Sequence, residues 1–130
     1  PVYPTYVGAA VMAGAEPRYL DATAATGFLP DLDRLDPTDL DRCSAFFLCS
    51  PANPQGAVAD LPYLRRLVAL ARRHGFLLVA DECYAELYDR NPPPSALQAA
   101  LELDGSRRRR AALALQAVER GRAARRLLRR

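Results

Sequence analysis

The feature that most constrains the fold is a pair of short apolar runs separated by one amphipathic helix. The runs cover residues 44–49 (SAFFLC) and 76–80 (FLLVA), and Gly75 stands just before the second. A helix over about 61–74 is predicted by the apolar face formed by Leu64, Leu67, Val68 and Ala71. Continuous apolar runs are typical of parallel strands buried on both faces. The pattern therefore predicts a βαβ unit, close to the ~30 residues such a unit needs.

Weaker patterns surround this unit. The small apolar stretch 4–15 predicts a short helix that ends near Gly14, and residues 18–23 read as a short strand. A further helix is expected near 95–103, after three consecutive prolines. A turn or short helix is expected where the Pro/Asp-rich loop places Leu32, Leu35 and Leu40. Together these elements predict an α/β fold with a mostly parallel sheet flanked by helices.

Both predicted strands run directly into a polar cluster. CSPANPQG (49–56) follows the first strand and DECY (81–84) follows the second. The carboxyl ends of parallel strands meet at one edge of the sheet, which is where ligands bind in such folds. We therefore expect the two clusters to form one site.

Three side chains in these clusters suit a planar heteroaromatic ligand. Taken singly, Asp81 reads as a helix cap, Tyr84 as a half-buried tyrosine and Asn53 as a turn residue. In combination, the acid can keep a ring nitrogen protonated, while the amide and the phenol donate to a ring oxygen.

At this point the sequence resembles a known family. CSPANPQG followed by ADECYAELY resembles the class I/II aminotransferases, the fold-type-I enzymes that use pyridoxal 5′-phosphate (PLP). The resemblance implies that this chain is part of their large domain. It also implies that Asn53 and Tyr84 bond the phenolic oxygen of PLP and that Asp81 pairs with its ring nitrogen.

A third stretch, PVYPTYVGAAVMAGAEP (1–17), resembles the P-x-Y-x-x-Y segment of the family. By this resemblance Tyr3 stacks on the ring of PLP, and Tyr6 has a packing role. The resemblance covers residues 1 to about 105 and is nearest to succinyldiaminopimelate transaminase. That enzyme moves an amino group between glutamate and a keto-acid precursor in lysine biosynthesis. It further implies a homodimer and small-molecule amino-acid and keto-acid partners.

The charge distribution divides the chain in two. Residues 1–106 carry 8 Arg against 14 Asp and Glu, a balance of −6, whereas residues 107–130 carry 10 Arg against one Glu, a balance of +9. We expect 1–106 to be a partial large domain, an internal piece of the enzyme. We expect 107–130 to be an Arg/Ala-rich helical or disordered tail foreign to the fold.

The chain contains no lysine, although the family depends on a lysine that binds PLP covalently. No catalytic residue is therefore assigned, and the chain as written is expected to be inactive. With permissible codons, a one-base shift of the reading frame converts residues 113–117 (LALQA) into Ser-Leu-Ser-Lys-Arg, a stretch that resembles the family's lysine motif. We therefore expect the tail to be a shifted reading frame.

Two other functions remain open from the sequence. The arginine-rich tail could bind nucleic acid or an anionic surface, and the fold could belong to another fold-type-I enzyme such as a carbon–sulfur lyase or a decarboxylase. Three cysteines and one histidine, His74, favour neither a zinc site nor a disulfide framework. Free thiols, and the lack of a ~20-residue apolar span, lead us to expect a cytoplasmic protein.

Overall fold

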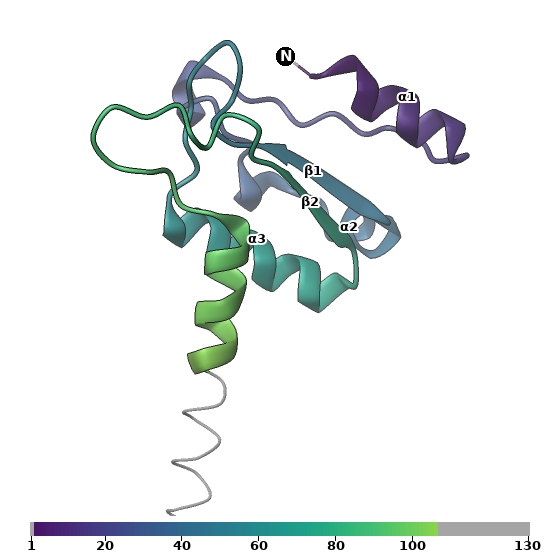
Figure 1. The fold of residues 1–130 in the computed structure, drawn as a ribbon. Coiled ribbons are helices and arrows are strands. Elements are labelled where there is room, and N and C mark those ends of the chain that lie inside the picture. Colours follow the sequence, from purple (N-terminus) through teal and green to yellow (C-terminus); the bar gives the residue numbers. More distant parts are fainter. Residues whose placement is uncertain (1, 107–130) are drawn as a thin grey trace, which may run out of the picture.

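The predicted βαβ unit forms the centre of the fold. In the computed structural model, which describes residues 2–106, strand β1 (Ala45–Cys49), helix α3 (Leu61–His74) and strand β2 (Leu77–Asp81) follow one another. The two strands pair in parallel, from Ala45 opposite Leu77 to Cys49 opposite Asp81. Figure 1 shows α3 lying along one face of this sheet. The α/β architecture and the parallel pairing are confirmed.

Both ends of α3 are set by local chemistry. Asp60 caps the first turn, because its carboxylate accepts a 2.8 Å hydrogen bond from the Tyr63 N–H. Gly75 ends the helix in the left-handed conformation, with φ of 78°, which costs glycine no steric strain. The predicted helix is confirmed to within one residue at each end.

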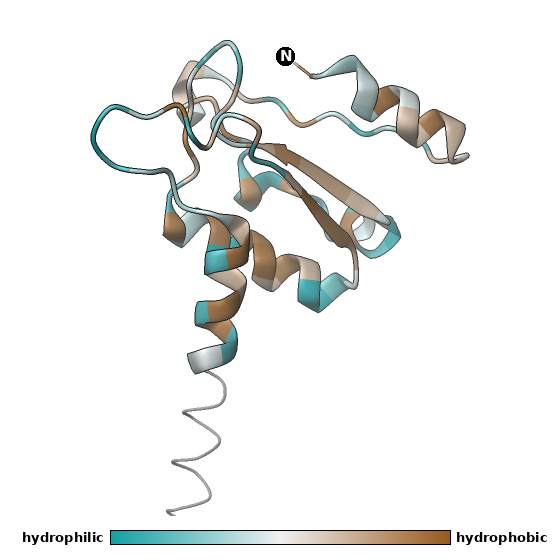
Figure 2. Cartoon of the chain, in the orientation of Figure 1, coloured by the Kyte–Doolittle hydropathy of each residue, from teal (hydrophilic) through white to brown (hydrophobic). Residues whose placement is uncertain are grey.

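The core lies between α3 and one face of the sheet. Phe46 and Leu48 of β1 point toward α3, where Leu64 and Leu67 are almost wholly buried. The hydropathy colouring in Figure 2 shows the strands as a continuous apolar strip. Other buried apolar residues complete this cluster: Leu32, Leu40, Ala59, Val68, Ala71, Phe76, Ala96 and Ala99. Burial of this apolar surface is the main force that holds the unit together.

Two expectations about strands were wrong. Neither strand is buried on both faces. In β1, Phe46 and Leu48 are buried, but Ala45 is exposed and Phe47 and Cys49 are half-buried. In β2, Leu77 is 65% exposed and the other four residues are only half-buried. Within residues 2–106, only β1 pairs with it, so its outer edge has no neighbour. Residues 18–23 form no strand, because a strand needs a hydrogen-bonded partner and no described segment pairs with them.

Of the remaining short elements, α1, η2 and α2 were expected from the sequence and η1 was not. Helix α1 covers Pro4–Met12, η1 covers Ala24–Thr26, η2 covers Leu32–Arg34 and α2 covers Pro37–Arg42. Leu32 and Leu40 are buried in the core, as the predicted turn required. Asp36 caps α2 by accepting from the N–H and the hydroxyl of Thr38, and these hydrogen bonds lower the pKa of its carboxyl.

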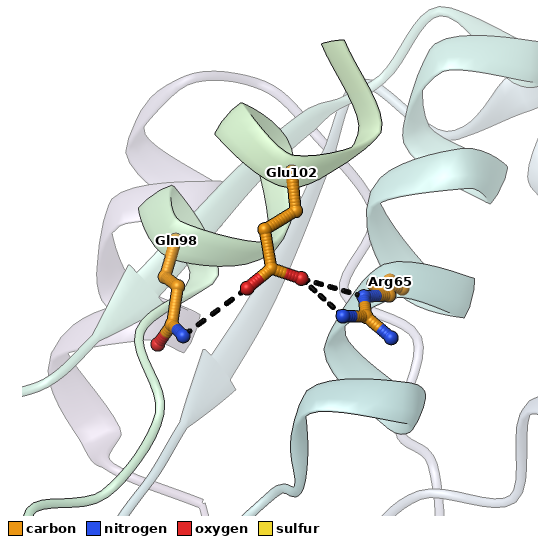
Figure 3. A network of polar contacts seen from close by, with 3 residues as sticks. All are labelled: Arg65, Gln98 and Glu102. Carbon is orange, nitrogen blue, oxygen red and sulfur yellow. Dashed lines mark hydrogen bonds and ion pairs between the residues drawn. The ribbon is translucent and has the colours of Figure 1, made fainter. Parts of the chain in front are cut away.

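A last helical segment, residues 96–106, packs beside α3 through the buried Ala96 and Ala99 and, at the surface, through ion pairs. Glu102 accepts from Arg65 of α3, with an Nε to Oε2 distance of 3.0 Å, and from the Gln98 amide at 3.3 Å (Figure 3). The neighbouring guanidinium lowers the pKa of Glu102. Arg72 makes a second pair with Asp104 at 3.0 Å. These contacts join the last helical segment to the outer surface of α3.

The tail predicted over residues 107–130 lies outside the described residues. Among the helices of residues 2–106, none combines the length and the apolar character that crossing a membrane requires. In the same part of the chain, no group of three or more His, Cys, Asp or Glu side chains could hold a metal ion.

Candidate functional site

The two polar clusters meet at one edge of the sheet, as predicted. Cys49 and Asp81 are opposite each other in the last paired position, and the Ser50 N–H donates to the Asp81 carbonyl at 3.0 Å. Figure 1 shows the loops after β1 and β2 leaving the sheet on the same side. The strands therefore place Asn53, Asp81 and Tyr84 around a common edge.

The loop that carries Asn53 is closed on itself. Ser50 is 5% exposed, and its hydroxyl accepts a 2.9 Å hydrogen bond from the Ala59 N–H across the base of the loop. Nearer the tip, the Gly56 N–H donates to the Ala52 carbonyl at 2.7 Å. Gly56 has φ of 67°, a conformation that favours glycine. This bracing restricts where the Asn53 amide can lie.

Asn53 and Tyr84 contact each other directly. The Asn53 amide nitrogen donates to the Tyr84 hydroxyl over 2.8 Å, although 31 residues separate them in the chain. Tyr84 is held by a turn in which the Ala85 N–H donates to the Glu82 carbonyl at 2.9 Å. The second amide hydrogen and the phenolic hydrogen remain available to donate to one acceptor oxygen.

Asp81 ends β2 with both carboxylate oxygens engaged. Oδ2 accepts from the Tyr6 hydroxyl, and Oδ1 accepts from the Cys83 N–H at 3.2 Å. The hydrogen bond from Tyr6 is the main cause that lowers the pKa of Asp81, and the Cys83 side chain and N–H lower it further, against the opposing effect of burial. The carboxylate is therefore ionised at neutral pH, and its remaining lone pairs can accept from a cationic ring N–H.

Of the two tyrosines in the N-terminal segment, Tyr6 contacts this carboxylate and Tyr3 contacts Tyr6. The Tyr6 ring stacks on Phe47 of β1, with centroids 4.9 Å apart and planes at 21°. The Tyr3 ring meets Tyr6 edge-on at 5.5 Å and is 60% exposed. The sequence predicted the packing of Tyr6 but missed its hydrogen bond to Asp81. No sequence signal for that bond was available, because it depends on how α1 packs over the sheet.

The sequence also did not predict the role of Glu82, whose side chain lies on the opposite, α3-facing side of the sheet. Its Oε1 accepts from the Ala96 N–H at 2.8 Å and so caps the last helical segment. It lines an open, largely apolar groove of about 550 Å³ on the α3 side, together with Leu78 and Ala80. This groove is not the candidate site, because its one carboxylate is already bound to the backbone.

The solved structures that resemble this fold are aminotransferases. Aminotransferase AspB from Helicobacter pylori 26695 matches with a TM-score of 0.70 and 37% identity, over 76% of this chain and 26% of that chain. A probable N-succinyldiaminopimelate aminotransferase from Thermus thermophilus matches with a TM-score of 0.68 and 32% identity, over 74% of this chain and 26% of that one. The fold is thus that of the fold-type-I, PLP-dependent aminotransferases.

The sequence comparisons specify the family. The family described as Aminotransferase class I and II matches residues 1–114. The LL-diaminopimelate aminotransferase of Desulforudis audaxviator (strain MP104C) is 40% identical over 101 residues, which are 77% of this chain and 26% of that protein. The chain belongs to the class I and II aminotransferase family, whose members use PLP. It spans about a quarter of the length of the curated relatives that it matches.

The residues present fit the ring of PLP. An ionised carboxylate with spare lone pairs suits the protonated ring nitrogen, and two donors 2.8 Å apart suit the phenolic oxygen. Because Asp81 and these donors lie at the same sheet edge, a single ring could meet both. The roles of Tyr3, Asn53, Asp81 and Tyr84 toward the cofactor stay predictions.

Proposed function

We propose that residues 1–106 form the ring-binding part of a PLP-dependent aminotransferase that moves an amino group between an amino acid and a 2-keto acid. The observation that carries the proposal is the juxtaposition at one sheet edge of an ionised Asp81 with the hydrogen-bonded pair of Asn53 and Tyr84. The family match over most of the chain supports it.

Each side chain has one task in this proposal. Asp81 holds the proton on the ring nitrogen, while Asn53 and Tyr84 fix the phenolic oxygen and so set the in-plane orientation of the ring. Tyr3 covers the face of the ring from the start of α1. When bound, PLP supplies an electron sink for the amino acid, and a protonated ring nitrogen strengthens that sink.

This chain does not transaminate in the proposal, because it contains no lysine. In the family a lysine binds the cofactor and moves the proton of the substrate. A full-length enzyme of this type would act as a homodimer. An assay of amino transfer from glutamate should therefore show no turnover by this polypeptide. Turnover that Asp81→Asn abolishes would overturn this part of the proposal.

The proposed substrates are of the diaminopimelate type. The names of the matched relatives include LL-diaminopimelate and N-succinyldiaminopimelate aminotransferases. We therefore propose glutamate as the amino donor and N-succinyl-2-amino-6-ketopimelate as the keto acid, a reaction of lysine biosynthesis.

Cofactor binding to the chain itself tests the ring site. Because the chain has no lysine, PLP cannot bind through the covalent lysine bond of the family, so its binding to the ring site can be measured without that bond. PLP should acquire a visible circular dichroism band when the chain is added, since a fixed ring in an asymmetric site becomes optically active. Asp81→Asn and Asn53→Ala should each reduce this band at a given concentration.

A matched variant controls for surface charge. Asp21→Asn removes an exposed carboxylate in an irregular segment and should leave the band unchanged. Equal losses in Asp21→Asn and Asp81→Asn would show that binding is non-specific and would contradict the ring site.

DNA sequence tests the proposed origin of the tail. The codons for residues 105–130 should be resequenced. A one-base correction that restores Ser-Leu-Ser-Lys-Arg would support the shifted frame. A confirmed frame whose shifted reading contains stop codons would overturn it and would favour a binding role for the arginines.

A further inference from the structure

The hydrogen bond between Tyr6 and Asp81 is a contact in the candidate site to which the proposed function assigns no role. The Tyr6 hydroxyl donates to Asp81 Oδ2, although 75 residues separate the two in the chain. Helix α1 has no buried residue of its own, so it has no core that could fix its position. Tyr6 supplies the described side-chain contacts that tie α1 to the sheet, its stack on Phe47 and its hydrogen bond to Asp81.

The Tyr6 ring is oriented before it reaches the acid. Side chains alternate between the faces of a strand, so Phe47 points away from α3, whereas Phe46 and Leu48 point toward it. Asp81 lies opposite Cys49, two residues beyond Phe47 on the same face. Stacked on Phe47, Tyr6 therefore has its hydroxyl directed along the strand toward the carboxylate.

The groups that face Asp81 come from three elements. Tyr6 belongs to α1, Cys49 to β1, and Cys83 follows β2. Burial raises the pKa of Tyr6, and its hydrogen bond to Asp81 raises it further, so this phenol stays protonated and always donates. Proximity of Asp81 likewise raises the pKa of the Cys83 thiol. The donated hydrogen bonds favour the charged form of the carboxylate.

We propose that Tyr6 is a positioning residue for Asp81, whose hydroxyl fixes the orientation of the carboxylate toward the proposed position of the cofactor nitrogen. The inference rests on the proposed PLP site, but the effect on Asp81 is a property of the chain without cofactor. A purely structural role for Tyr6 would require its ring alone. A positioning role requires the hydroxyl.

Tyr6→Phe separates these two roles, because it keeps the ring that stacks on Phe47 and removes only the hydroxyl. Side-chain carboxyl carbons are followed by NMR across a pH titration of the full chain without PLP. The Asp81 resonance is identified by its loss in Asp81→Asn. We expect the midpoint of the Asp81 titration to move upward in Tyr6→Phe, since the carboxylate has lost its strongest donor.

Two further variants keep the test decisive. Tyr19→Phe removes the hydroxyl of a tyrosine that is 63% exposed and should leave the Asp81 midpoint unmoved. Phe47→Leu keeps the Tyr6 hydroxyl but weakens its support, so the midpoint should move in the same direction and less. An Asp81 midpoint that is unchanged in Tyr6→Phe, with the helical circular dichroism retained, would overturn the proposal. If Tyr6→Phe does not fold, an unmoved midpoint in Phe47→Leu would do so.

Binding of PLP then separates the positioning role of Tyr6 from the PLP site itself. Tyr6→Phe should weaken the binding of PLP by roughly tenfold, the size of one charge-assisted hydrogen bond. A shifted Asp81 midpoint with no binding of PLP to the unmodified chain would preserve the positioning role and reject the PLP site. Binding of PLP that Tyr6→Phe leaves unchanged would reject the positioning role and preserve the site.

Discussion

The two faces of the β1–β2 sheet are built differently. On the α3 side, Phe46 and Leu48 meet an apolar helix face, and Leu64 and Leu67 are almost wholly buried. On the α1 side, the contacts are one aromatic stack on Phe47 and the hydrogen bonds of Asp81. The first face supplies most of the apolar burial that drives folding, and the second brings together the polar groups of the candidate site.

This difference shows how one short sheet can serve stability and chemistry together. Apolar contacts hold through buried area and tolerate little loss of volume. Hydrogen bonds near solvent add little net free energy but fix direction. Substitutions on the two faces should therefore have separable effects, and four experiments test how complete that separation is.

The largest loss of stability is expected from Leu67→Ala. Leu67 is 0% exposed, so truncation leaves a cavity between α3 and the sheet and should lower the free energy of unfolding by about 3 kcal/mol. Urea denaturation followed by circular dichroism measures it. Leu97→Ala, at a residue that is 68% exposed, is the control and should change the value by less than about 0.5 kcal/mol. Equal losses would mean that α3 does not pack on the sheet as described.

Removal of the Tyr6 ring that stacks on Phe47, on the other face of the sheet, should lower the free energy of unfolding by less. Tyr6→Ala loses a half-buried ring and should lower the free energy of unfolding by about 1–2 kcal/mol. Because α1 has no buried residue, its amide hydrogens should exchange much faster while those of α3 keep their protection. Tyr19→Ala is the control. A loss as large as that of Leu67→Ala would erase the distinction between the faces.

The acid on the α1 side should make stability depend on pH. The pKa of Asp81 is lower in the folded chain than its ordinary value of 3.8, so its contribution is complete above about pH 4 and is lost as the pH falls through the folded value. The urea midpoint of the unmodified chain should therefore fall more steeply on acidification than that of Asp81→Asn. A constant difference between the two at every pH would contradict the lowered pKa.

The smallest effect is expected at the surface of α3. Glu102→Gln removes the charge that pairs with Arg65, but the pair is open to solvent and is screened by salt (Figure 3). We expect no resolvable change in the urea midpoint at about 0.15 M salt. The comparison is with Leu67→Ala in the same titration. A loss that approaches that of Leu67→Ala would show that this surface pair contributes as much stability as a buried core side chain.

Much of the fold was predictable because its signals are local. The apolar face of α3, its Asp60 cap and its Gly75 terminus all act within a few residues, and the structure has the helix where they predict it. The strand expected over 18–23 failed because strand formation depends on a partner that local pattern cannot supply. The exposure of Leu77 was missed for the same reason, since an apolar run does not reveal what covers it.

In the candidate site, too, some contacts were predictable from the sequence and others were not. The meeting of Asn53 and Tyr84 followed from two motifs at the ends of parallel strands, so topology alone predicted it. The bond from Tyr6 to Asp81 joins segments 75 residues apart and depends on the docking of α1, which no motif describes. The contact of Glu82 with Ala96 was not predicted, because the DECY motif was interpreted only for the residues that would bind a ligand. Glu82 lies on the opposite face of the sheet from Asp81.

Asp81 and Glu82 are consecutive, yet one serves the site and the other caps the last helical segment. One peptide unit and the Glu82 side chain therefore connect the acid of the candidate site to the start of residues 96–106. That segment packs into the core through Ala96 and Ala99 and pairs with Arg65 and Arg72 of α3. The backbone at Asp81 is thereby anchored to β1 on one side and, through Glu82, to the last helical segment on the other.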